Sequence, residues 1–192
     1  MYRDHNCGEL TIKNVGEKVT IAGWVQRIRN LGSMIFIDLR DQFGITQIVV
    51  SADNKEKLEN VVSECVIQVV GTVVERSNKN TKILTGEIEV EAQEIEILGK
   101  CKNVLPFEVN SEKTGEVKED LRLEYRFLDL RNDKLHKTIL LRSEVMKTIR
   151  KKMDELGFTE IQTPILANSS PEGARDYLVP SRLHPGEFYA LP

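Results

Sequence analysis

Hydrophobic and polar positions alternate with a period of two over most of the first hundred residues, which predicts a series of short β-strands. The predicted strands cover residues 19–29, 34–41, 45–51, 66–77 and 86–98. Between the third and fourth strands, residues 54–62 have the charge and apolar spacing of one short helix. Three strands, a short helix and two further strands is the order of an OB-fold, a five-stranded all-β Greek-key barrel that binds oligonucleotides.

The pattern changes after this predicted barrel. Pro106 and the polar run NSEKTGEVKED indicate a hinge over residues 104–131. Within it, Tyr125–Arg131 mixes apolar and charged residues, and we interpret it as a buried anchor to the next domain. Apolar residues then recur near a 3.6-residue period, which predicts a helix from about Asn132 to Leu156. Asn132 or Asp133 can cap its start, and Gly157 is the expected C-cap residue. A short apolar strand pattern leads to Pro164, a loop follows from Pro171 to Arg182, and the last residues, FYALP, resemble one more strand. The expected division is therefore 1–103, 104–131 and 132–192.

Composition narrows the class of protein. The chain has 192 residues, of which 30% are charged and 40% hydrophobic, as is typical of a globular protein. Three widely separated cysteines form no CxxC pair, and the three histidines lack metal-ligand spacing, so we expect free thiols and no metal site. The first residues lack the features of a signal peptide, and no apolar run approaches the ~20 residues of a membrane span. We expect a cytoplasmic protein that does not enter a membrane.

The net charge of −3 gives no general attraction to nucleic acid, so binding would need a local basic patch. Phe36 lies on the strand face opposite Ile35 and Ile37, where it could stack on a base or merely cover a neighbouring side chain. Gln47 could read a base edge through its amide, but strand parity does not settle which way it points. The basic residues expected around Phe36 are Arg27, Arg29, Arg76, Lys79 and Lys82.

Two acidic features have plainer interpretations. The alternating glutamates at positions 87, 89, 91, 94 and 96 predict a solvated face of the last barrel strand that would repel nucleic acid. Glu172 stands on a loop between Pro171 and Pro180, where it could approach a ligand amine or simply face solvent.

Several motifs together resemble bacterial-type aspartyl-tRNA synthetases, which are class II enzymes. LGFTEIQTPIL is similar to the family's motif 1, a helix and strand ending at a dimer-interface proline, here Pro164. PEGARDYLVPSR, residues 171–182, is similar to the flipping loop over the aspartate pocket. GWVQRIRNLGSMIFIDLRD, GITQIVV and TGEIEV resemble the anticodon-binding domain, and LEYRFLDLR resembles the segment that enters the catalytic domain.

The resemblance implies a role for individual residues. Arg29, Phe36 and Gln47 would contact anticodon bases. Arg76 and Asn80 would bind the anticodon from the loop between the fourth and fifth strands. Glu172 would bind the amino group of L-aspartate, and Pro164 would lie in a homodimer interface. Residues 132–192 would begin the class II catalytic domain.

The resemblance also implies that the parent enzyme uses ATP and Mg²⁺ to activate L-aspartate and then charges tRNA(Asp), whose anticodon stem-loop the barrel would bind. Motifs 2 and 3 are absent, so we expect no catalytic residue, no tight cofactor binding and no activity in this chain alone. A stand-alone OB-fold RNA-binding module and a general single-strand binder are the alternatives. Asparaginyl and lysyl enzymes share the domain plan but fit the loop less well, and charging of tRNA(Asn) stays open.

Overall fold

A computed structural model describes residues 2–51, 55–56, 58–102, 104–110, 117–169 and 175–191. The chain forms two compact units, Met1–His136 and Lys137–Pro192, and each is described by itself.

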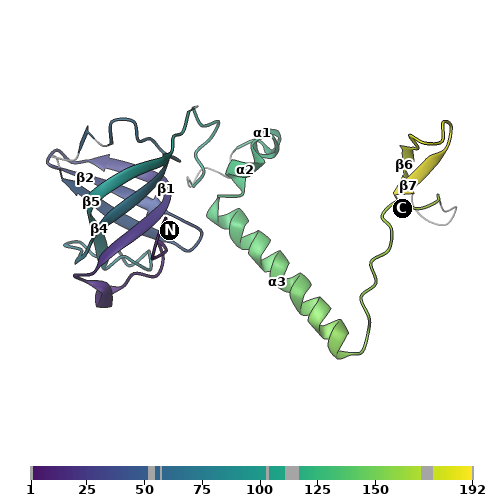
Figure 1. The fold of residues 1–192 in the computed structure, drawn as a ribbon, viewed down its shortest axis with the longest axis horizontal. Coiled ribbons are helices and arrows are strands. Elements are labelled where there is room, and N and C mark those ends of the chain that lie inside the picture. The colour runs from purple at the N-terminus through teal and green to yellow at the C-terminus, as the bar shows by residue number, and fades with distance from the viewer. Residues whose placement is uncertain are drawn as a thin grey trace. The chain divides into compact units, whose positions relative to one another are not determined.

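The first unit is built on a closed barrel of five strands (Figure 1). These are β1 (Lys18–Asn30), β2 (Met34–Arg40), β3 (Ile45–Ser51), β4 (Val66–Glu75) and β5 (Ile88–Gly99). Their order around the barrel is β1-β2-β3-β5-β4, with β3 and β5 parallel and the other neighbours antiparallel. Of the predicted helix at 54–62, residues 55, 56 and 58 are in 3₁₀ conformation, and residues 54 and 57 lie outside the described part. The predicted OB-fold is confirmed.

The alternating pattern fills the barrel as expected. On β2 the residues Ile35, Ile37 and Leu39 are buried, and Phe36 and Asp38 face outward with partial exposure. Strand β1 departs from strict alternation, because a β-bulge interrupts its pairing with β2 between Val25 and Arg27. A bulge inserts one extra residue and so exchanges the two faces of the strand beyond it.

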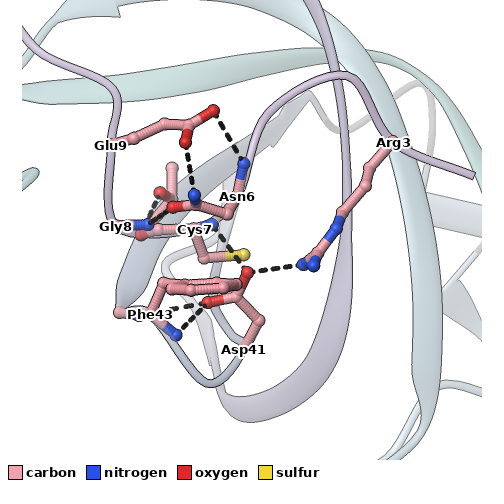
Figure 2. A network of polar contacts seen from close by, with 9 residues as sticks. Arg3, Asn6, Cys7, Gly8, Glu9, Asp41 and Phe43 are labelled. Atoms are coloured by element: carbon pink, nitrogen blue, oxygen red, sulfur yellow. Dashed lines mark hydrogen bonds and ion pairs between the residues drawn. The ribbon is translucent and has the colours of Figure 1, made fainter.

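The segment before β1 is fastened to the turn between β2 and β3 (Figure 2). Asp41 Oδ2 accepts hydrogen bonds from Arg3 Nη1 at 2.7 Å and from the backbone N–H of Cys7 at 3.0 Å. Its other oxygen accepts from the backbone N–H groups of Phe43 and Gly44. One carboxylate therefore closes the turn and holds the N-terminal segment, which continues through the short 3₁₀ helix η1 (Ile12–Asn14).

The predicted hinge contains more structure than its polar sequence indicated. Helices α1 (Glu119–Glu124) and α2 (Arg126–Asp129) lie within it. A second small core is formed by Phe107, Val109 and Leu128. The fully buried Asp129 is bound by the guanidinium groups of Arg122 and Arg126. Leu128 and Asp129 of the expected anchor are therefore buried, but their described partners lie within the hinge itself.

Glu64 joins this hinge to the barrel within the first unit. Its carboxylate lies 2.8 Å from Arg40 Nη2 and 3.0 Å from Arg131 Nη1. The same two guanidinium groups lie 5.9 and 4.8 Å from the ring centroid of Trp24. Glu64 itself has a φ of 63°, a left-handed conformation that costs a non-glycine residue about 1–2 kcal/mol.

Helix α3 (Asp133–Glu155) begins and ends with the predicted caps. Asn132 Oδ1 accepts hydrogen bonds from the backbone N–H groups of Lys134 and Leu135. At the other end Gly157 has a φ of 83°, and the N–H groups of residues 157 and 158 donate to the carbonyls of residues 154 and 153. This pair of bonds is a Schellman motif.

The second unit differs from expectation in two places. No strand forms between Phe158 and Pro164, because this segment has no neighbouring strand to pair with among the described residues. The expected loop at 171–182 includes a strand, β6 (Tyr177–Pro180), which pairs antiparallel with β7 (Phe188–Leu191). Strand β7 is the one predicted from FYALP.

Candidate nucleic-acid interface

The bulge in β1 sets up the outer face of the barrel. Beyond it, Ile28 pairs with the buried Ile37 and packs against the core, and Arg29 pairs with Phe36 on the outer side. The Arg29 guanidinium carbon lies 5.9 Å from the centroid of the Phe36 ring, within cation–π range. An arginine and an aromatic ring are therefore presented together on one exposed face.

A polar cluster extends this face across four strands. Gln47 on β3 lies directly opposite Asp38 on β2, so its side chain points outward, not into the core. Its Oε1 accepts hydrogen bonds from Arg29 Nη2 at 3.0 Å and from Arg76 Nη2 at 2.8 Å. Its Nε2 donates to Glu89 Oε2 at 2.6 Å. The Gln47 amide thus connects the end of β1 with the residues on either side of the loop between β4 and β5.

The cluster balances its charges and leaves donors to spare. Arg29 Nη2 also donates to Asp38 Oδ1 at 2.8 Å, which gives two guanidinium groups and two carboxylates around one amide. Among the described residues, Arg29 Nε and Arg76 Nη1 are buried without a hydrogen-bond partner. An unsatisfied buried donor costs about 1–3 kcal/mol, so these groups favour an added acceptor that lets them turn outward.

The loop between β4 and β5 is held by its own backbone. Asn80 N–H donates to the carbonyl of Gly86, and Asn80 Oδ1 accepts from the N–H of Lys82. A Cβ added at Gly86 would lie 1.7 Å from the Asn80 carbonyl oxygen, so this position requires glycine. The Asn80 side chain shapes the turn at Lys82, and it has no hydrogen bond to the Gln47 cluster among the described contacts.

The basic residues that were expected around Phe36 have different surroundings. Arg27 is exposed at the end of β1, and Lys82 is exposed on the loop. Lys79 lies 2.9 Å from a Glu75 oxygen and 3.5 Å from a Glu87 oxygen, so its charge is already compensated.

Glu89 departs from the expected solvated, repelling face of glutamates at positions 87, 89, 91, 94 and 96. It is half-buried, and its carboxylate accepts a hydrogen bond from the Gln47 amide. On the neighbouring strand β3, Val49 pairs with Glu91, and this register places the outer residues of β5 beside those of β3. A parallel pairing between third and fifth strands, as in a closed OB barrel, would have indicated this contact.

Two further candidate residues, Pro164 and Glu172, belong to the second unit and are expected to have roles other than anticodon binding. Pro164 is exposed, as are its neighbours Ile161 and Ile165. Glu172 lies outside the described residues. The described residues contain no group of three or more His, Cys, Asp or Glu side chains that could hold a metal ion. Within that same part of the chain, the helices are too short or too polar to cross a bilayer.

Two family models match the chain. Residues 19–98 match the OB-fold nucleic acid binding domain of the tRNA anti-codon family, and residues 118–192 match class II tRNA synthetases (D, K and N). The first match covers the barrel with its Gln47 cluster, and the second covers α1 to β7.

Curated relatives extend over the whole chain. It is 52% identical over 197 residues to an aspartate–tRNA(Asp/Asn) ligase of Chlamydia caviae, covering all of this chain and 33% of the relative. It is 52% identical to an aspartate–tRNA ligase of Lactobacillus johnsonii, covering 99% of this chain and 31% of the relative. The chain therefore spans about a third of the length of these relatives, and it matches their N-terminal part.

Solved structures agree with the fold. An asparaginyl-tRNA synthetase from Pyrococcus horikoshii, in complex with asparaginyl-adenylate, superposes with a TM-score of 0.81 at 25% identity over all of this chain and 43% of that one. The resemblance inferred from the motifs is confirmed by these comparisons.

Proposed function

We propose that this chain is the N-terminal part of an aspartate–tRNA ligase and that its barrel binds the anticodon stem-loop of tRNA(Asp). In this proposal residues 1–103 form the anticodon-binding domain, residues 104–131 form the hinge, and residues 132–192 begin the class II catalytic domain. The observation that carries the proposal is the joining of Arg29, Gln47 and Arg76 in one hydrogen-bonded cluster beside Phe36.

The chemistry of the cluster suits unpaired bases. Phe36 offers a ring on which a base can stack, a contact worth about 1–3 kcal/mol per base. The two arginines can donate hydrogen bonds to base oxygens or phosphates. Arg29 Nε and Arg76 Nη1 have no partner in the structure, so an RNA oxygen would give each of them an acceptor. Gln47 and Glu89 add an amide and a carboxylate that can exchange partners with the edge of a base.

Asn80 has a weaker place in the proposal. Its side chain accepts a hydrogen bond from the backbone of Lys82 and so shapes the turn. We therefore propose that Asn80 affects RNA binding indirectly, by fixing the conformation of the loop. Arg76, at the start of the same loop, is the contact residue that the Gln47 hydrogen bond supports directly.

The test is a titration of the chain, at fixed salt, with a stem-loop carrying the anticodon GUC and with the same stem-loop whose central base is replaced. We expect tighter binding of GUC. Phe36→Ala should weaken it at least about five-fold, the lower limit for losing one stacked base. Gln47→Ala should reduce the preference between the two loops, because both arginines lose their shared acceptor.

Phe43→Ala is the matched control. Phe43 is also an exposed aromatic residue of the barrel, but it lies on the turn between β2 and β3 over Arg3. Binding that is lost equally in Phe36→Ala and Phe43→Ala, or that does not distinguish the two stem-loops, would contradict the proposal and favour a general single-strand binder.

We propose that the parent enzyme activates L-aspartate with ATP and Mg²⁺ and transfers it to tRNA, with Glu172 binding the amino group of the amino acid. Motifs 2 and 3, to which the resemblance assigns the ATP-binding arginines of the parent enzyme, are not among these 192 residues. The present 192 residues alone should therefore fail to exchange pyrophosphate into ATP in the presence of aspartate. Detectable exchange would disprove this.

The parent is further proposed to be a homodimer, with Pro164 in the interface. The exposure of Pro164 between the exposed Ile161 and Ile165 supports this, since apolar residues grouped on a surface mark contact sites. Light scattering of the full-length enzyme and of its Pro164→Asp variant would give the two molar masses. A cytosolic location is proposed because none of the three cysteines, all of which are described, is in a disulfide.

A further inference from the structure

Two cysteines that are far apart in the sequence meet where β4 begins and β5 ends. Cys65 directly precedes β4, and Cys101 follows β5 by two residues. The strands are antiparallel and pair Val66 with Gly99, which brings the flanking residues side by side. The backbone N–H of Cys101 donates to Cys65 Sγ at 3.3 Å. Neither side chain is in a disulfide in this structure.

This arrangement is close to that of a disulfide. A disulfide requires Cα atoms about 4.4–6.8 Å apart. The register of Val66 with Gly99, extended by one residue, puts Lys100 opposite Cys65, so Cys101 lies one residue beyond the directly paired position. What brings the two cysteines together is the contact of 3.3 Å between Cys65 Sγ and the backbone nitrogen of Cys101. Because the Cys65 sulfur already touches the backbone of Cys101, a rotation of the Cys101 side chain can bring the two sulfur atoms together. No rearrangement of the strands is needed.

The two thiols differ in access. Cys65 is fully buried in the barrel core, where its sulfur also accepts from the N–H of Val62. Cys101 is partly exposed and lines a cavity of about 380 Å³ together with Trp24 and Arg131. An oxidant therefore reaches Cys101 first, and Cys65 is placed behind it to complete the bond.

We infer that Cys65 and Cys101 form a reversible disulfide under oxidising conditions, which fastens the segment leaving the barrel to the start of β4. The oxidant is a small-molecule disulfide such as oxidised glutathione. The Cys101 thiolate attacks one sulfur of that disulfide and releases one thiol. The Cys65 thiolate then attacks the Cys101 sulfur and releases the second thiol. Two protein thiols lose two electrons and two protons, and one small disulfide is reduced to two thiols.

The bond would act at the junction between barrel and hinge. Glu64, next to Cys65, holds both Arg40 of the barrel and Arg131 of the hinge. Fixing Cys65 to Cys101 closes a chain loop and restrains this junction. Closing a loop of this length also limits the unfolded chain, so the oxidised protein should be the more stable form. The inference does not depend on RNA binding.

Cys7 provides the internal control. Burial, and then the charge of Asp41, raise the pKa of the Cys7 thiol far above its usual range. The backbone N–H of Cys7 belongs to the network around Asp41 at the N-terminal segment (Figure 2), and none of the described hydrogen bonds joins Cys7 to either of the other two cysteines. Cys7→Ala should therefore leave the reaction unchanged.

The experiment is incubation of the full 192-residue chain with oxidised glutathione, followed by intact mass and peptide mapping. We expect a loss of roughly 2 Da for two hydrogens, a Cys65–Cys101 peptide, and full reversal by dithiothreitol. Cys7→Ala should behave in the same way. Cys101→Ser should not lose the two hydrogens, and it tests the inference without removing the buried Cys65. The unfolding midpoint of the oxidised wild type should rise by at least about 5 °C over the reduced form, with no such rise in Cys101→Ser.

Three results would overturn the inference. The first is a stable glutathione adduct on Cys101 that does not proceed to the internal bond. The second is a disulfide that involves Cys7. The third is a protein whose thiols stay unreacted although the oxidant converts a small thiol in the same solution.

Discussion

Replacing Glu64 by alanine tests how the hinge is held to the barrel. The Glu64 side chain is only 4% exposed and accepts from Arg40, which is 3% exposed, and from Arg131, which is 28% exposed. Removal of a buried partner leaves the other charge buried and uncompensated, which costs about 3–5 kcal/mol. A cavity beside Arg40, lined also by Ser63 and Asn110, can admit water to the guanidinium group that has lost its partner. We therefore expect the lower end, about 3 kcal/mol.

The loss is large enough to measure, since a domain of this kind is stable by about 5–15 kcal/mol. Trp24 is the only tryptophan in the chain, and its ring lies against both arginines. Its fluorescence during urea unfolding therefore reports on the unit that contains Glu64. Arg131→Ala should cost only about 1 kcal/mol, because Arg131 is partly solvated and its loss still leaves Glu64 paired with Arg40.

Two comparisons separate charge from backbone strain. Glu64→Gly should be about 1 kcal/mol more stable than Glu64→Ala, because glycine adopts the φ of 63° without a steric cost. Adding Arg131→Ala to Glu64→Ala should cost little more, since the shared carboxylate is already gone. A loss below about 1 kcal/mol in Glu64→Ala, or an equal loss in Arg131→Ala, would refute the assignment of Glu64 as the buried link.

Two further substitutions test the local geometry. Gly86→Ala should destabilise the barrel by more than about 2 kcal/mol in urea unfolding and weaken stem-loop binding, because the added carbon would overlap the Asn80 carbonyl. Gly99→Ala is the control. Its added carbon would lie 3.5 Å from the Val66 side chain, so it should cost under about 1 kcal/mol. Asn132→Ala should cost about 1 kcal/mol by removing the cap of α3, and it should speed hydrogen exchange at residues 134 and 135. Asn132→Asp should keep that protection. Equal exchange in the wild type and both variants would contradict the role of the cap.

Much of the fold could be read from the sequence because burial imposes it. The barrel strands and α3 were predicted within a few residues, since alternation of period two and a 3.6-residue apolar period report directly on which face is buried. The caps of α3 were also predictable, because Asn132 and Gly157 have short-range reasons to occupy those positions. The missing strand at 158–164 shows the limit, since a strand also needs a partner, which a local pattern does not supply.

The binding face required information that alternation does not contain. Strict alternation along β1 would place Arg27 and Arg29 on the same face as the buried Val25, and only the bulge turns them outward. The apolar positions change phase between Val25 and Ile28, but the place of the bulge is fixed only by the pairing with β2. The direction of Gln47 likewise followed only from its position opposite Asp38.

The charge balance of this face limits how much of the proposed RNA affinity can come from phosphate contacts. Of the five basic residues predicted there, Arg29 and Lys79 are in ion pairs with carboxylates, which leaves three, Arg27, Arg76 and Lys82, to neutralise phosphates without breaking an ion pair. At about −0.7 per phosphate, log K should fall with log salt with a slope of about −2, or about 20-fold between 50 and 200 mM salt. A protein that relied on six to ten phosphate contacts would lose about 10³- to 10⁵-fold over the same range. In the proposed complex most of the affinity would therefore come from short-range contacts, namely stacking on Phe36 and the hydrogen bonds centred on Gln47, and the hydrogen bonds would distinguish one base from another.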